Sequence, residues 1–170
     1  MSENPGERVL VAGIGNLFCG DDGFGPEVVR QLLVAGDLPE QVRAVDYGIR
    51  GMHLAYDLLD GYAALVVVDA LPNGRSRSEP PGTLTVLEVG PDDLGSGDLD
   101  PHGMAPVAVL ASLSALGGRL PATYVVGCTP ADVGEGIGLS PSVGSAVSAA
   151  ADLVRRVVRE RILVSTDGGR

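Results

Sequence analysis

Three side chains suited to metal or acid–base chemistry stand in three separate parts of the sequence. Asp22 follows a glycine-rich turn, Asp69 ends the most apolar run of the chain, and His102 follows an Asp-Pro pair. Two carboxylates and one imidazole suit a divalent first-row metal with open coordination positions. Two carboxyl groups held close together could also share a proton and polarise a water molecule.

Each of these residues also has a purely structural explanation. Asp22 could favour the start of the following helix, because acids suit the positive end of the helix dipole. Asp69 could be an ordinary turn acid, and His102 could stand at a helix entry. Ligands of open α/β sheets bind at the carboxyl ends of the strands. Expected convergence of the three residues at that edge is what favours a functional site.

The elements that must position these residues follow from the apolar pattern. We predict strands at residues 8–12, 42–45, 63–68, 82–89 and 123–127, and helices at residues 26–35, 51–59, 105–116 and 141–163. Strands that alternate with helices predict a mostly parallel α/β sheet with helices on both faces. Residues 82–89 alternate apolar and polar side chains after a Pro-Pro turn, which favours an antiparallel edge strand. A length of 170 residues predicts a single domain, 1–170.

The charged residues exclude several classes of function. All 12 basic residues are Arg, so P-loop, Schiff-base and Ser–Lys chemistry are excluded. The 22 acids give a net charge of −10, which argues against nucleic acid and anionic membranes as partners. No apolar run approaches the ~20 residues of a membrane span. The polar start of the chain lacks an export signal, so we expect a cytoplasmic protein. We also expect a monomer.

A nucleotide site is a weaker interpretation of the first glycine turn. Gly13 and Gly15 begin like a dinucleotide fingerprint, but Phe18 stands where the third glycine belongs. Asp21 and Asp22 then place negative charge where a pyrophosphate needs positive potential. We therefore predict no bound nucleotide cofactor.

Longer motifs carry a more specific resemblance. Residues 13–25, with the sequence GIGNLFCGDDGFG, closely resemble the N-terminal signature of the nickel–iron hydrogenase maturation endopeptidases. The similarity continues in order through DYG at residues 46–48, GM at 51–52, VVVDA at 66–70, PH at 101–102 and GLSP at 138–141. It covers essentially the whole chain.

This resemblance implies a function, a site and a fold. Members of the family remove a C-terminal extension from the hydrogenase large-subunit precursor after nickel insertion. By matching motifs, Asp22, Asp69 and His102 correspond to the catalytic, metal-contacting set, and the nickel is expected to arrive with the precursor. The peptidase is then either nickel-dependent or of aspartic type. The implied fold is a three-layer α/β/α sandwich around a mixed five-stranded sheet with one antiparallel edge strand.

Departures from the family pattern lie near the expected substrate edge. Residues 46–50 read DYGIR where the family often has DGGT, and Ala131 follows Pro130 where a Glu is common. These changes leave open which hydrogenase is processed. A non-catalytic chaperone that binds the metallated precursor, and a nucleotide-binding α/β domain, remain the alternatives.

The remaining polar residues receive structural interpretations. Cys19 and Cys128 are expected to pack rather than to form a disulfide, and His53 to be a packing or surface residue. Asn16 is expected to fix the turn backbone. Separately, Ser140 is expected to cap the last helix, whose final arginines suit the helix dipole. Arg50 is expected to be solvated. Four acids are expected to crowd one edge of the sheet and so to favour a bound cation: Asp21, Asp22, Asp46 and Asp69.

Overall fold

A computed structural model describes residues 7–71, 79–90 and 105–163, with the side chains of 105–109 excepted. Its sheet has five strands in the order β2-β1-β3-β5-β4. They are β1 (Val9–Ile14), β2 (Val42–Gly48), β3 (Ala64–Ala70), β4 (Leu84–Val89) and β5 (Ala122–Cys128). Every pairing is parallel except that of β4 with β5. The predicted antiparallel edge strand is confirmed.

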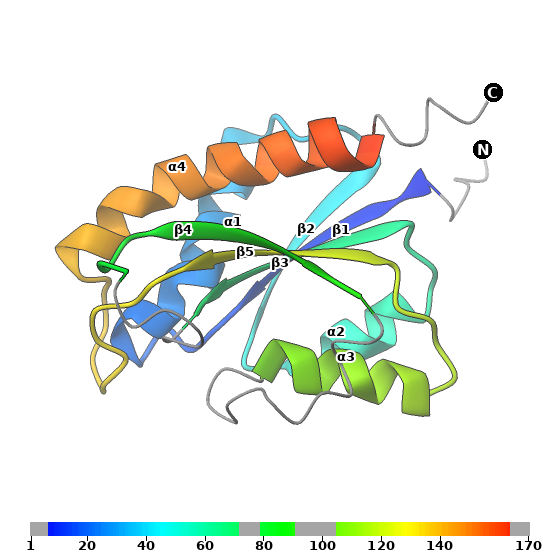
Figure 1. The fold of residues 1–170 in the computed structure, drawn as a ribbon, viewed down its shortest axis with the longest axis horizontal. Coiled ribbons are helices and arrows are strands. Elements are labelled where there is room, and N and C mark those ends of the chain that lie inside the picture. The colour runs from blue at the N-terminus through cyan, green and yellow to red at the C-terminus, as the bar shows by residue number, and fades with distance from the viewer. Residues whose placement is uncertain (1–6, 72–78, 91–104, 164–170) are drawn as a thin grey trace.

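Helices cover both faces of this sheet (Figure 1). They are η2 (Gly20–Gly23), α1 (Phe24–Ala35), α2 (Gly51–Leu58), α3 (Ala105–Ala115), α4 (Pro141–Val157) and its π-helical continuation η5 (Val158–Leu163). α1 and α4 lie together on one face, and α2 and α3 lie together on the other. The predicted three-layer α/β/α sandwich with a mixed five-stranded sheet is therefore confirmed.

Side-chain alternation along the strands divides the interior into two cores. Val66 and Val68 of β3 pack against the α1 and α4 layer, whereas Leu65 and Val67 pack toward α2 and α3. Both faces of β3 are buried because it lies at the centre of the sheet. Asp69 continues the alternation on the side of Leu65 and Val67. The Asp69 carboxyl group therefore lies near the end of a strand that is buried on both faces.

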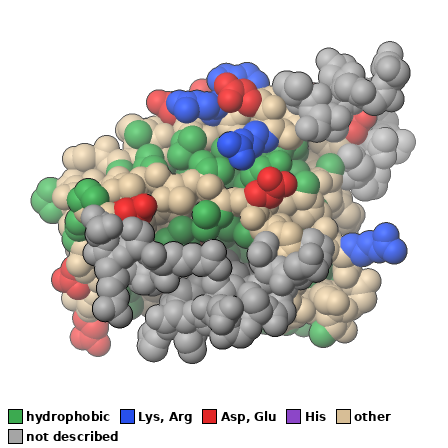
Figure 2. Space-filling model, viewed as in Figure 1, with side chains coloured by type: hydrophobic (Ala, Val, Ile, Leu, Met, Phe, Trp, Pro, Cys, Tyr) green, Lys and Arg blue, Asp and Glu red, His purple; other side chains and the backbone are tan. Residues whose placement is uncertain are grey.

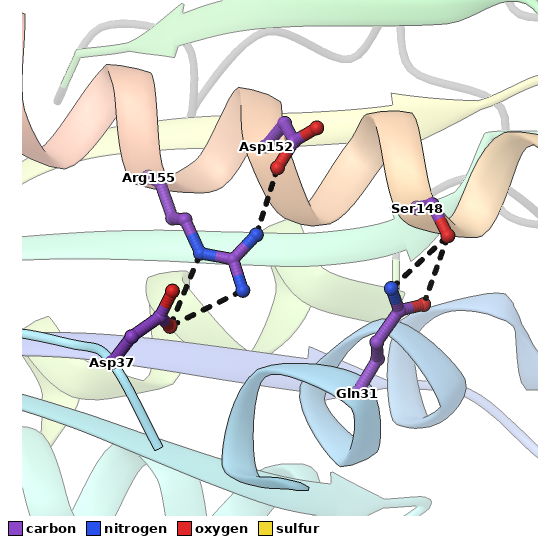
Figure 3. Close-up of polar contacts among 5 residues, drawn as sticks. All are labelled: Gln31, Asp37, Ser148, Asp152 and Arg155. Carbon is purple, nitrogen blue, oxygen red and sulfur yellow. Dashed lines mark hydrogen bonds and ion pairs between the residues drawn. The ribbon is translucent and has the colours of Figure 1, made fainter. Parts of the chain in front are cut away.

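Charged side chains gather over the C-terminal part of α4 and over η5 (Figure 2). Arg155 donates to Asp37 at 3.2 Å and to Asp152 at 2.8 Å, while Gln31 on α1 donates to Ser148 on α4 at 3.0 Å (Figure 3). The expectation that the arginines only match the helix dipole is therefore incomplete, since Arg155 forms ion pairs. These contacts join the middle of α4 to α1, and the C-terminal end of α4 to the turn that follows α1.

No helix of the described residues is both long enough and apolar enough to cross a bilayer. This agrees with the absence of a long apolar run in the sequence.

Candidate active site

Two glycines of the first motif allow the turn after β1 to pack tightly on the sheet edge. Gly15 has a φ of +145°, and a Cβ there would lie 1.8 Å from the carbonyl oxygen of Asp22. A Cβ on Gly25 would lie 2.2 Å from the carbonyl oxygen of Val68 and 2.4 Å from that of Ile14. Only glycine fits such approaches. The start of α1 therefore rests directly on the ends of β1 and β3.

This packing brings two of the three predicted site residues together. Asp22 lies in η2, which packs against the end of β3, where Asp69 is located. The Oδ2 atom of Asp22 accepts a hydrogen bond of 2.8 Å from the backbone N–H of Asn16. That bond fixes one carboxylate oxygen of Asp22 toward the turn. The turn after β1 thus holds an acid beside the end of the central strand.

Asp69 is a buried acid with an altered proton affinity. Its side chain is 6% exposed, and burial raises the pKa of its carboxyl group well above the ordinary value. The negative charge of Asp22 raises this pKa further, while the backbone N–H of Ala70 lowers it in part. Asp69 is therefore held toward its protonated form beside a carboxylate. Such a pair can transfer a proton or receive a cation.

Asp21, the neighbour of Asp22, has a different role that the sequence did not reveal. Its carboxylate is fully buried and accepts hydrogen bonds from the backbone N–H groups of Ala131, Asp132 and Ser140 at 2.7 to 3.0 Å. The Ser140 hydroxyl donates a fourth bond at 2.8 Å. Burial alone raises the pKa of Asp21, but these bonds outweigh it and lower the pKa. Asp21 therefore joins the turn after β1 to the loop after β5.

The same bonds correct the expected role of Ser140. It occupies the position before α4, with Pro141 first in the helix as predicted, but its hydroxyl makes no capping bond. The hydroxyl instead donates to Asp21. The contact spans 119 residues of sequence, so no local pattern could have indicated it.

Fewer acids act on Asp69 than the sequence predicted. The carboxylate of Asp21 already accepts hydrogen bonds from backbone N–H groups. The Oδ1 atom of Asp46 accepts a hydrogen bond of 2.8 Å from the backbone N–H of Gly48, in the same turn. Only Asp22 acts on the proton affinity of Asp69 among these acids. Arg50 is exposed, as expected, and its guanidinium also donates to the carbonyl oxygens of Asp46 and Tyr47.

Several structural interpretations are confirmed. Asn16 Oδ1 accepts the backbone N–H of Phe18 at 2.9 Å, which fixes the turn. Neither cysteine forms a disulfide, and burial raises the pKa of Cys128 to about 11. His53 is exposed on α2.

His102 lies outside the described residues, three positions before α3 begins at Ala105. Within the described part of the chain, no group of three His, Cys, Asp or Glu side chains is arranged to hold a metal. The described residues therefore contribute two carboxyl groups to the predicted set of three.

Comparison with known proteins gives a consistent result. Residues 26–157 match the family model described as hydrogenase maturation protease, HycI. The hydrogenase 2 maturation protease of Escherichia coli is 30% identical over 157 residues, which cover 90% of this chain and 92% of that protein. The hydrogenase expression/formation protein HupD of Rhodobacter capsulatus is 32% identical over 155 residues, covering 89% of this chain and 71% of that protein.

Solved structures show the same similarity. The hydrogenase maturating endopeptidase HybD from E. coli superposes with a TM-score of 0.74 at 29% identity, covering 91% of this chain and 94% of that one. The [NiFe] hydrogenase maturation protease HybD from Thermococcus kodakarensis gives a TM-score of 0.71 at 25% identity, with coverage of 89% and 99%.

Proposed function

This chain belongs to the hydrogenase maturation protease family, and we propose that Asp22, Asp69 and His102 form the site with which it removes the C-terminal extension of a nickel-loaded large-subunit precursor. Family membership confirms the resemblance of the motifs, and the chain is a hydrogenase maturation endopeptidase. The precursor, its nickel and the residues that act on it constitute the proposal.

One observation carries the proposal. A buried carboxyl group, Asp69, lies one residue before the end of the central strand, where the charge of a second carboxylate, Asp22, acts on it. A structural acid would be surrounded by donors, as Asp21 is, whereas Asp69 experiences a neighbouring negative charge. Perturbed acids at the carboxyl edge of an α/β sheet are typical of functional sites.

The donor set suits the nickel of the precursor. Carboxylate oxygens and an imidazole are ligands that divalent first-row metals accept. A cation placed against Asp22 and Asp69 would offset the repulsion between them, which favours binding of the loaded precursor over the unloaded one. Nickel brought by the substrate supplies positive charge for recognition and for polarising the scissile carbonyl.

The same two acids are also our candidates for proton transfer. Asp22, held by the Asn16 N–H, is the candidate base that takes a proton from the attacking water. Asp69, held toward its protonated form, is the candidate acid that donates to the leaving amine. Contact with nickel would require Asp69 to lose its proton, so acid–base chemistry by this pair and nickel contact through Asp69 are alternative uses of the same side chains.

A processing assay tests the proposal. Purified protein is incubated with nickel-loaded and with nickel-free precursor from the same genome, and the released C-terminal peptide is measured by mass spectrometry. We expect release from the loaded precursor only, and loss of release with Asp22→Ala or His102→Ala. Full activity of either variant would overturn the site assignment. A stable complex without cleavage would favour the chaperone alternative.

We also propose that the enzyme acts in the cytoplasm as a monomer and binds neither nucleic acid nor membrane. Two free cysteines suit a reducing compartment, and the net charge of −10 disfavours polyanions. Fractionation of cells and sedimentation of the purified protein test the location and the oligomeric state.

A further inference from the structure

Two loops at the carboxyl edge of the sheet expose large apolar side chains. Leu17 and Phe18, in the turn after β1, are 48% and 67% exposed. Val133 and Ile137, in the loop between β5 and α4, are 46% and 82% exposed. We call these four residues the apolar ridge. In Figure 1 both loops lie at the end of the sheet where β1, β3 and β5 terminate.

Backbone hydrogen bonds join the two halves of the ridge. The N–H of Gly136 donates to the carbonyl oxygen of Phe18, and the N–H of Gly20 donates to the carbonyl oxygen of Gly136, both at 2.8 Å. Cys19 and Gly136 form a parallel β-bridge. Phe18 and Ile137 therefore flank this bridge, Phe18 before Cys19 and Ile137 after Gly136.

Hydrogen bonds of Asp21 hold in place the loop that carries Val133 and Ile137. The N–H of Asp21 donates to the carbonyl oxygen of Asp132, and its carboxylate accepts the four bonds from Ala131, Asp132 and Ser140. These hydrogen bonds thus hold the two loops that carry the ridge to each other. A surface fixed before binding loses less conformational entropy when a partner arrives.

The ridge is continuous with the proposed active site. Asn16, which donates its N–H to Asp22, directly precedes Leu17. Leu17 also lies against Gly23, where a Cβ would be 3.2 Å from the leucine Cδ2. The Leu17 end of the ridge therefore adjoins the position that a scissile bond at Asp22 would occupy.

We propose that the apolar ridge binds an apolar segment of the large-subunit precursor next to its scissile bond. This inference rests on the proposed function, because the occupant is the protein substrate of the same site. Exposed Phe and Ile side chains lose their water contact when such a segment covers them, and this favours binding. The ridge therefore sets substrate affinity, whereas Asp22 and Asp69 act at the scissile bond.

Steady-state cleavage of nickel-loaded precursor tests this assignment. The variants are Phe18→Ser, Ile137→Ser and the two combined, with KM and kcat measured separately. We expect the double variant to raise KM by about tenfold or more, as loss of central apolar contacts commonly does, with kcat within about twofold. Phe18→Leu and Ile137→Val keep the apolar surface and should restore KM.

A matched control uses exposed apolar residues far from the site. Leu33 and Val34 are 55% and 76% exposed near the end of α1, whose first residues rest on the strand ends. Leu33→Ser with Val34→Ser should leave KM unchanged. The inference is overturned if the ridge variants match this control, or if they lower kcat alone. Failure of the unaltered protein to cleave loaded precursor would instead refute the proposed function.

Discussion

Asp21 and Asp69 are both buried acids at the same edge of the sheet, yet their surroundings are opposite. Three backbone amides and a hydroxyl donate to Asp21, and the pKa of its carboxyl is lowered. Asp69 lies beside the negative charge of Asp22, and its pKa is raised. Burial alone therefore does not tell a structural acid from a reactive one. The neighbouring groups decide it.

Removing Asp69, the acid that we propose to be reactive, should have the largest effect on activity. Asp69→Asn keeps the shape of the side chain but cannot ionise, so we expect cleavage to fall by about 10³-fold, within the usual range for a general acid or base. The melting temperature should stay the same or rise, because an acid next to another carboxylate is lost. Asp46→Asn is the matched control, since that acid serves only its own turn. Cleavage within threefold of normal in Asp69→Asn would contradict the comparison.

Removing the structural acid should instead reduce stability. Asp21→Asn replaces one acceptor oxygen with an amide that faces N–H donors, so we expect the free energy of unfolding to fall by about 3 kcal/mol. Denaturant unfolding followed by circular dichroism measures this change. Asp22→Asn is the neighbouring control and should be much less destabilising. Equal losses in the two variants would show that the buried bonds of Asp21 add little.

The pH dependence of stability should separate the two acids by sign. The lowered pKa of Asp21 stabilises the fold above the unfolded value of about 4, and this contribution is lost as pH falls through the folded pKa. The raised pKa of Asp69 has the reverse effect. Its contribution is full below the unfolded pKa and is lost as pH rises through the folded one.

Unfolding curves from pH 3 to 8 for the unaltered protein and both Asn variants measure these contributions. The free energy of unfolding of the unaltered protein minus that of Asp21→Asn should grow as pH rises. The same difference taken with Asp69→Asn should shrink as pH rises. Two differences of the same sign would refute the assigned pKa shifts.

Divalent metal should act on one acid and not on the other. At a free nickel concentration of five times its dissociation constant, we expect stabilisation of about 1 kcal/mol by mass action. Asp69→Asn should abolish the shift in melting temperature, whereas Asp21→Asn should retain it. Magnesium at the same concentration serves as the control ion. A nickel shift that survives in Asp69→Asn would place the metal elsewhere.

Removing the exposed ion pairs of Arg155 should have the smallest effect on stability. Arg155 binds Asp37 and Asp152 on the surface of α4 (Figure 3), where solvent screens the ion pairs. Arg155→Ala should therefore lower the free energy of unfolding by less than about 1 kcal/mol. A larger loss in thermal or denaturant unfolding would mean that this contact holds α1 and α4 together.

The sequence alone determined the layer architecture because its signals are local. Apolar runs marked the strands, the alternation at residues 82–89 marked the antiparallel edge, and Gly and Pro marked helix ends. Asp22 and Asp69 were predictable as neighbours because parallel strands end at one edge. The proposed third member of the site, His102, remains a prediction from the motif.

Only the tertiary structure separated Asp21, which is structural, from Asp22 and Asp69, which we propose to be reactive. The partners of Asp21 lie 110 to 119 residues away along the chain, and the residue pattern around it is the same as that around Asp22. Hydrogen bonding and desolvation depend on what lies within a few ångströms in space. The sequence therefore determined where acids would gather. The packing of two distant loops determined that Asp21 would hold the fold while the charge of Asp22 acted on Asp69.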